Sequence, residues 1–485
     1  MADTFSNPLQ IQIIDVRITK FNKTDSMSIF PQFVELVLYQ SMFEPVIKAE
    51  MLINDKIGMF TNYPFTGEEF IDITYKTLTG INATTSKEKT IKFIIRGVRN
   101  IIADDNARAL MYIIDLTSVE FLQNTRKYVS HAYADLVEDM AEKVYDDYIK
   151  KDTQDLIGET KPFVKEESIK VRSLIVPNVR PFQAIQWLAK HAVAKDYEKK
   201  FQYLFFENLD GFNFVTLQKL IEDGKQKRGE LQQKAYVYRS EVESSYSNKN
   251  GASDPEAPLR MITNLVINKR FSSIEKISSG YYQNELFEVS MLQKAYHVTP
   301  TELKPDFDVE KLTLEGAPLN TKGYIEYVKN KVENTEYANR IRYIINNYED
   351  FDGQAKTQPE YRLKVGKAMQ NLIALNQIDL TITVPANMDL KAGQVIYLKI
   401  PEMHGFNDVQ LDLYITGLYI INEVKQVVSI GNQAATTLRV YKDGYFTSLY
   451  EKSFYNKDGG LARSNTVIDP DTGRPITSSG GRGGA

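Results

Sequence analysis

The stretch that decides the fold is LKAGQVIYLKIPE at residues 390–402. Successive side chains of an extended chain point to opposite faces, so an alternating apolar pattern predicts a strand with one buried face. That face would carry Ile396, Leu398 and Ile400. Gly393 supplies a turn before the strand, and Pro401 ends it where no ladder donor is needed. We therefore predict a strand that begins just after Gly393.

The composition is that of an ordinary globular protein. The chain has 485 residues, 42% of them hydrophobic and 25% charged, a length that favours about two to four domains. A net charge of −4 argues against wrapping nucleic acid, because neutralising phosphates needs a dense basic surface. There is no cysteine, which excludes disulfides and thiolate metal sites. We expect neither a signal peptide nor a membrane-spanning segment.

Strand patterns fill two regions of the chain. Residues 8–120 contain successive runs rich in Ile, Val, Tyr, Phe and Thr, separated by turn-forming residues. Residues 377–446 return to this pattern. We interpret 1–120 as one β domain and 377–448 as the larger part of a second.

A mixed α/β segment is expected between the two β regions. HAYADLVEDMAEKVYDDYIK at 131–150 has apolar residues at helical spacing. A second helix should open at Pro181, since proline suits a first helical turn. Two strands then form a predicted hairpin around the turn at 209–211. Residues 121–220 therefore predict a small α/β domain.

Two segments are expected to pack poorly. Residues 221–260 are interpreted as a charged linker or extension, because 222–258 carry little apolar surface. The tail at 449–485 is rich in Gly and Ser and is predicted to be flexible. The tail would be mobile or ordered only by a partner.

The segment 261–376 is interpreted as a hairpin of the second β domain followed by a helical insertion. The hairpin is expected at 280–300, where strand patterns flank a short connection. Helices are expected at 320–350 and 358–376.

The two β regions share a weak internal similarity. IIRGV at 94–98 matches YITGL at 414–418, with Gly97 and Gly417 in register. Gly67 and Gly393 both precede a strand, and the strands agree if one copy has an extra residue. We expect these four glycines to mark turns of two related domains.

The hairpin at 35–52 also resembles the segment 285–298. The second hairpin lies much farther from its glycine, so the second copy would carry a long insertion. The strand at 390–402 would then resume a β domain that the helices interrupt.

No pattern of catalytic or metal-binding residues is specific. The four histidines are His131, His191, His297 and His404, and none belongs to a helical metal motif. No phosphate loop or nucleophile elbow occurs. The acid pairs at 68–69 and 146–147 are interpreted as solvated charge, and DPDTGRP at 469–475 lacks the last Glu of a calcium loop. We expect no cofactor or metal, which favours a structural role.

The order of motifs resembles a known family. The motifs are YRLKVGKAMQNLIALNQIDLTITVPANMDLKAGQVIYLKIPE at 361–402, DLYITGLYIINEVKQVV at 412–428, TTLRVYKDG at 436–444, GYYQNELFEV at 280–289, and segments 34–55, 67–75 and 203–214. Together they resemble the baseplate hub proteins of contractile-tailed bacteriophages. That family includes the T-even hub and the hub half of type VI secretion spike proteins. The resemblance covers most of residues 30–446.

The resemblance implies an α+β, β-dominated fold. It would contain two similar antiparallel β-barrel-like tube domains, with α/β and helical insertions. A homotrimer would then present six similar domains around a channel. It would join the six-fold tail tube to the trimeric central spike, in the baseplate of a virion whose parts are made in the host cytoplasm.

The expected partners are the tail tube protein, the central spike protein and other baseplate (wedge) proteins. DNA would pass through a polar, neutral or acidic channel without specific binding, and no membrane insertion is expected. The loop with Met42, Phe43 and Pro45 is a candidate contact between subunits; a plain hairpin loop is the alternative.

Two other functions remain open from the residues. One is a tail-associated enzyme that degrades cell wall or polysaccharide, supported only by abundant acids and tyrosines. The other is a carbohydrate-binding adhesin, which usually shows repeats that this sequence lacks.

Overall fold

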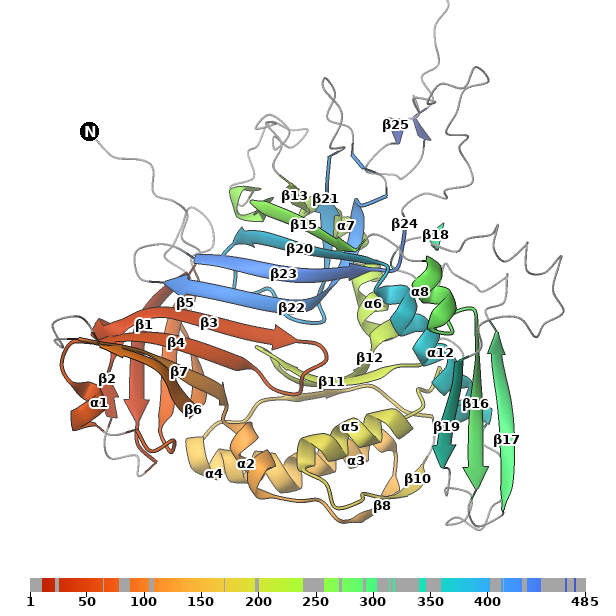
Figure 1. The fold of residues 1–485 in the computed structure, drawn as a ribbon, viewed down its shortest axis with the longest axis horizontal. Coiled ribbons are helices and arrows are strands. Elements are labelled where there is room, and N and C mark those ends of the chain that lie inside the picture. The colour runs from red at the N-terminus through yellow and green to blue at the C-terminus, as the bar shows by residue number, and fades with distance from the viewer. Residues whose placement is uncertain are drawn as a thin grey trace, which may run out of the picture.

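Figure 1 shows the computed structural model of the chain. The structure describes residues 11–21, 26–63, 65–77, 88–103, 109–169, 171–196, 200–238, 257–269, 273–290, 294–302, 314, 317–318, 340–345, 359–401, 411–412, 414–429, 434–445, 467–468 and 475–476. One large sheet dominates them, with helices and smaller sheets around it.

The large sheet contains fourteen strands. They are β1 Ile11–Thr19, β2 Ser26–Ser28, β3 Phe33–Ser41, β4 Lys48–Asp55, β5 Phe70–Thr77, β6 Glu88–Ala103, β7 Leu110–Ser118, β13 Tyr236–Tyr238, β14 Met261–Ile262, β15 Asn264–Lys269, β20 Ile378–Pro385, β21 Val395–Lys399, β22 Gly417–Ser429 and β23 Ala434–Lys442. The predicted β-dominated fold is confirmed. The barrel-like detail is not confirmed, since none of the described sheets closes on itself.

Strands β3 to β7 form what we call the first strand unit. Their spatial order is β3–β4–β7–β6–β5, with every neighbour antiparallel. Beyond β5, strand β1 and then β2 extend the sheet. Alternation along each strand buries one face, as Leu38, Met51 and Ile114 show. These side chains form a core with the short helix α1 Met59–Asn62 and the 3₁₀ turn η1 Phe30–Gln32.

Strands β15 and β20 to β23 form the second strand unit. Their spatial order is β15–β20–β23–β22–β21, again antiparallel throughout. Numbered along the chain, the two units therefore have the same topology: first strand beside second, second beside fifth, fifth beside fourth, and fourth beside third. The second unit has its own core, which includes Leu380, Leu398 and Leu438.

The two units share their strand register in addition to their topology. The pairing of β6 with β7 shifts by one residue between Ile95 and Gly97, and that of β22 with β23 shifts between Ile421 and Glu423. A β-bulge leaves one residue unpaired and bends its strand, and it is specific to its place in a sheet. A bulge shared at the same place supports a duplicated unit.

The extra residue expected near Gly67 is also found. Phe70 lies opposite Ile94, and Val395 lies opposite Ile420, so Phe70 and Val395 are equivalent. Phe70 is three residues beyond Gly67, whereas Val395 is two beyond Gly393. The first unit therefore has one residue more in this turn.

Two parts of the sequence match are wrong. The shared bulge aligns IIRGV at 94–98 with IINEV at 420–424, so Gly97 corresponds to Glu423 and not to Gly417. The hairpin at 280–300 does form, but in a separate sheet. The counterpart of the β3–β4 hairpin is β15 with β20, two strands that a long insertion separates in sequence.

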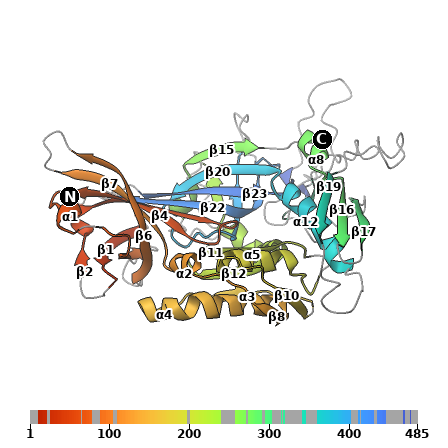
Figure 2. The ribbon, with the colours of Figure 1, turned by 60° about the horizontal axis from the view of Figure 1, so that its bottom comes forward.

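The helices and strands of residues 120–216 lie below the sheet, as Figure 2 shows, and we keep the name α/β domain for them. Its elements are α2 Glu120–Arg126, β8 Ala132–Asp135, α3 Val137–Tyr145, the π-helical turn η3 Asp146–Lys150, α4 Lys151–Ile157, β9 Phe163–Lys165, β10 Arg172–Ile175, α5 Pro181–His191, β11 Tyr203–Asn208 and β12 Gly211–Thr216. The helix at Pro181 and the hairpin are confirmed. The helix expected from 131 begins only at Val137, because 132–135 pair with β10. Phe182, Phe205 and Phe212 lie in its core.

The interpretation of 222–258 as a poorly packing segment is wrong for residues up to 238. The chain forms α6 Leu217–Gln226, α7 Arg228–Gln233 and then β13, which runs parallel to β21. Ile221 is buried, and a Cβ on Gly224 would lie 2.4 Å from the Val395 Cβ. Glycine thus allows α6 to pack closely on β21. Residues 239–256 lie outside the described part.

The insertion between β15 and β20 packs beside the α/β domain. It includes α8 Ser273–Ser278, β16 Gln283–Ser290, β17 Ala295–Glu302, β19 Arg340–Ile345 and α12 Pro359–Leu375. The helix at 358–376 is confirmed. The helix expected over 320–350 is wrong at 340–345, which form a strand parallel to β16; residues 320–339 and 346–350 are outside the described part.

Short elements complete the described structure. They are the 3₁₀ turn η5 Ala257–Arg260, β18 Ala317–Pro318, β24 Gly444–Tyr445, β25 Val467–Ile468 and β26 Pro475–Ile476. Apart from β25 and β26, the predicted flexible tail at 449–485 lies outside the described residues.

Candidate functional site

The candidate functional site is the junction between the two strand units of the chain. Strand β22 pairs with β21 through its first residues, and with β3 of the first unit through Glu423–Ser429. Figure 1 shows β3 and β22 side by side at the centre of the sheet. The junction is antiparallel, with Val427 opposite Val37. Two units of one chain thus join edge to edge.

Apolar side chains are buried along the junction. The exposed fraction of Leu36 is 2% and that of Val37 is 9%, while Val428 is 4% exposed. The Met42 N–H continues the contact by donating to the Asn422 carbonyl oxygen at 3.0 Å. Burial and backbone hydrogen bonds therefore stabilise this contact together.

At the other two positions of the pattern, the same edges have no partner strand within the described part of the chain. Strand β6 corresponds to β22, and beyond Ile95 its residues 97–103 pair with β7 alone among the described strands. Strand β15 corresponds to β3, and its one described partner is β20. Ile102 is 64% exposed and Val266 is 46% exposed.

The predicted contact loop is only partly available to another subunit. Met42 is fully buried, in a cluster with Phe206 and Leu418, so its side chain contacts the chain's own core. Phe43 is 44% exposed and Pro45 is partly exposed. A contact through Phe43 and Pro45 stays a prediction.

The four predicted turn glycines occupy different environments. Gly67 and Gly393 have φ of +84° and +83°, in the left-handed region that favours glycine. Gly417, with φ of +137°, opens β22 opposite Leu398. Gly97 lies inside β6 rather than in a turn.

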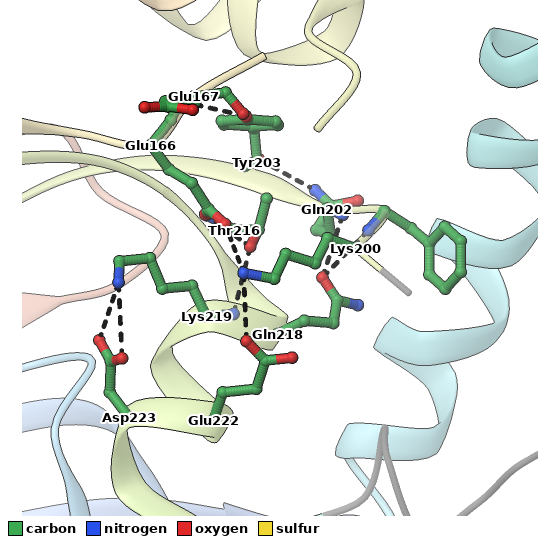
Figure 3. Close-up of polar contacts among 11 residues, drawn as sticks. Glu166, Glu167, Lys200, Gln202, Tyr203, Thr216, Gln218, Lys219, Glu222 and Asp223 are labelled. Atoms are coloured by element: carbon green, nitrogen blue, oxygen red, sulfur yellow. Dashed lines mark hydrogen bonds and ion pairs between the residues drawn. The ribbon is translucent and has the colours of Figure 1, made fainter. Parts of the chain in front are cut away.

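A charged cleft of about 550 Å³ lies on the α/β domain. It is lined by Lys165, Glu166, Glu167, Lys195, Asp196, Lys200 and Lys219. Glu166 accepts hydrogen bonds from the Thr216 N–H and hydroxyl, each at 2.7 Å, and from Lys200 Nζ at 2.9 Å, as Figure 3 shows. Thr216 also caps α6 by accepting from the Lys219 N–H. Glu166 thus fastens β12 and α6 to the loop that carries it.

The lysines of the cleft are matched by carboxylates of the same chain. Lys165 contacts Asp139 and Glu142, Lys195 contacts Glu167, Lys200 contacts Glu166 and Glu222, and Lys219 contacts Asp223. Burial opposes the charge of Lys200, but its bonds to Glu166 and Glu222 raise its pKa. This pattern fits a structural ion-pair network better than a general acid–base pair.

A buried carboxylate links the α/β domain to the first strand unit. Glu207 accepts from the Ile47 N–H at 2.8 Å, from the Ser118 hydroxyl at 2.5 Å and from Lys161 Nζ at 2.6 Å. Lys161 also contacts Glu120, which is buried. Desolvation raises the pKa of Glu207. No local sequence pattern predicts this network, because its members are far apart along the chain.

The histidines have structural surroundings where they are described. His191 packs edge-on against Trp187, with ring centroids 4.2 Å apart, and burial lowers its pKa to about 3. His131 packs against Tyr133, and His297 lies on β17 opposite Glu288. His404 and residues 469–474 lie outside the described part. Within the described residues, no group of three or more metal-ligating side chains is found.

The helices of the described residues include none that is long and apolar enough to cross a membrane.

Solved structures similar to the chain include two phage tail proteins and a type VI secretion component. The tail protein from Neisseria meningitidis has 13% identity and a TM-score of 0.45, covering 89% of this chain and 97% of its own. The 43 kDa tail protein of prophage MuSo2 from Shewanella oneidensis has 7% identity and a TM-score of 0.44, covering 89% and 98%. A type VI secretion component of E. coli, itself described as similar to T4 tail proteins gp27 and gp5, has 8% identity and a TM-score of 0.39, covering 93% and 79%.

No protein-family model matches the chain, and no curated protein matches it. With TM-scores below 0.5, the structural similarities do not by themselves assign a function. Two of these three solved structures are phage tail proteins, and the third is a type VI secretion component.

Proposed function

We propose that the chain is a structural subunit of a phage-tail baseplate hub. Three copies would form a ring that joins the six-fold tail tube to a trimeric central spike. The observation that carries this proposal is the duplicated strand unit, with its shared topology, register and bulge. Three chains with two equivalent units each present six similar positions, which a six-fold partner and a three-fold partner can both match.

The β3–β22 junction supports a ring made by sheet edges. Exposed edges invite uncontrolled pairing, and a closed arrangement removes them. A chain that joins its own two units edge to edge already contains one example of the contact that such a ring needs. Each tube domain would then be completed by its neighbours instead of closing on itself.

The proposed partners are the tail tube protein, the spike protein and wedge proteins of the baseplate. DNA would pass through the centre of the ring without specific binding. The net charge of −4 fits a channel that does not retain phosphates. The insertion between β15 and β20, which the first unit lacks, would lie at three positions of the ring and could contact wedge proteins.

The proposal is tested by the mass and symmetry of the purified full chain. We expect light scattering at micromolar concentration, alone or with the tail tube protein, to give three times the mass of one chain. Class averages from electron microscopy should show a ring with a central opening. A chain that stays monomeric in both conditions contradicts the proposal, and lysis of cell-wall material that a carboxylate substitution abolishes would favour the enzyme alternative.

A further inference from the structure

Among the described strands, two sheet edges without a partner strand match the two edges that are paired in the internal junction. We propose that copies join by pairing residues 97–103 of β6 in one copy with β15, residues 264–269, of the next. This inference rests on the proposed ring and specifies its contact. The occupant of both edges is a second copy of this chain.

The correspondence of the strands fixes which edges are involved. In the junction, β22 offers Glu423–Ser429, the part beyond its bulge, on the edge that it shares with β21. The corresponding edge of β6 is the one shared with β5, where pairing ends at Ile94. The partner in the junction is β3, whose counterpart is β15. The open edge of β6 therefore corresponds to the edge of β22 that pairs with β3, and β15, the counterpart of β3, is the strand that would fit it.

Apolar residues at the paired edges are less exposed than their counterparts at the open edges. Val37 of β3 is 9% exposed, whereas its counterpart Val266 of β15 is 46% exposed. Val428 of β22 is the counterpart of Ile102 when residues are counted from the shared bulge; it is 4% exposed, whereas Ile102 is 64% exposed. Apolar side chains are thus buried where the edge is paired and exposed where it is not. Pairing with another copy would remove this apolar surface from water.

The two edges differ, so the contact is head to tail. Each copy has one β6 edge and one β15 edge, and a contact between unlike surfaces either closes into a ring or continues as a filament. Three copies would contain three such contacts and three internal junctions. All six contacts around the ring would then use one pattern of strand pairing.

The register of the contact follows from the junction. Val37 lies opposite Val427, and the counterpart of Val37 is Val266. Counting from the shared bulge along β6 places Ile101 opposite Val266. The pairing of β6 with β7 shifts a second time, between Arg99 and Ile102. If this shift is included in the count, Ile102 lies opposite Val266 instead. One of these two isoleucines should therefore lie within disulfide distance of Val266.

Cysteine cross-linking tests this contact, because the chain has no cysteine of its own. The full-length variants are Ile101→Cys, Ile102→Cys and Val266→Cys, all at exposed positions where folding should be unaffected. Under mild oxidation, a mixture of the Val266 variant with one of the other two should give a disulfide-linked dimer on a non-reducing gel. Each variant alone should give none. A chain with both cysteines should give a covalently closed trimer.

Two controls calibrate the experiment. Val37→Cys with Val427→Cys in one chain should form an internal disulfide, since these residues lie opposite each other in the junction. Val298→Cys, 43% exposed on β17, should not cross-link to either isoleucine variant.

Light scattering of the unmodified chain separates the two proposals. If the chain is a trimer but neither mixture cross-links, the contact is wrong and the hub remains supported. If single variants dimerise alone, the contact is two-fold and the inference is overturned. If the chain is a monomer with and without the tail tube protein, and no cross-link forms, both proposals fail.

Discussion

Gly393→Ala should destabilise the protein more than Gly67→Ala, although both glycines have the same backbone conformation. With φ of +83° and +84°, each alanine would be held in the left-handed region, which costs about 1–2 kcal/mol. Part of that cost is offset, since alanine also lowers the entropy of the unfolded chain by about 0.4–1 kcal/mol. We therefore expect Gly67→Ala to lower the free energy of unfolding by about 1 kcal/mol.

The surroundings of the two glycines separate them. A Cβ at Gly67 would meet nothing within 4 Å, whereas a Cβ at Gly393 would lie 2.8 Å from Phe206 Cζ and 3.4 Å from Leu220 Cδ1. Phe206 is 1% exposed, so its ring has little room to move. Overpacking of a core typically adds about 1–3 kcal/mol. The expected loss for Gly393→Ala is therefore about 2–4 kcal/mol.

Native-state hydrogen exchange is the suitable assay, because a chain of 485 residues need not unfold in two states. The opening free energy of β21 in Gly393→Ala is compared with that of β5 in Gly67→Ala. Adding Phe206→Leu should recover part of the loss in the Gly393 variant, since it removes the ring edge. Equal losses at the two sites, or no recovery, would show that the contact with Phe206 does not determine the difference.

Three further predictions follow from buried polar contacts. Lys161→Met should lower the free energy of unfolding by about 3–5 kcal/mol, because Glu207 and Glu120 are left buried without their cation; denaturant unfolding that is unchanged would contradict this. Thr216→Ala should lower the free energy of unfolding by about 1 kcal/mol, measured by thermal unfolding, because the N-cap of α6 is lost. Thr216→Ser should keep most of this stability, because serine retains the hydroxyl. Burial, and to a lesser extent Arg172, lowers the pKa of Lys364 to about 7. The unfolded chain then binds more protons than the folded one from about pH 7 to pH 10, so the free energy of unfolding should rise by up to about 1.4 kcal/mol per pH unit in this range. Lys364→Met should remove this slope. An unchanged slope in that variant would contradict the lowered pKa of Lys364.

The sequence predicted the strands whose alternation is visible locally. The strand after Gly393 is β21, and Leu398 and Ile400 are buried as expected. The helix at Pro181 was equally predictable from its first-turn proline and apolar spacing. These elements carry their signal within a few residues.

The features that failed depend on contacts far apart along the chain. The match of Gly97 with Gly417 was wrong because the shared feature is a bulge at Arg96 and Asn422, where no glycine is needed. The second hairpin was misassigned because β15 and its partner β20 are separated by more than a hundred residues, so another hairpin nearby matched better.

The candidate contact edges could not be predicted from the sequence either. The pairing of β3 with β22 joins residues near 40 with residues near 425, and no local pattern encodes it. Charged residues around α6 concealed its apolar side, with Leu217 and Ile221 both buried. A count of charge per segment therefore underestimates packing wherever apolar residues fall on one side of a short helix.

The two hairpin connections have a consequence for engineering. In one unit the connection is a short loop, while in the other the same position holds α8, α12 and a three-stranded sheet, and the strand register is nevertheless retained. A turn that tolerates so large an addition is a natural place for grafting foreign domains. The loop at Phe43–Pro45 should accept a folded passenger in the same way, provided that Met42 and Ile47 keep their buried places.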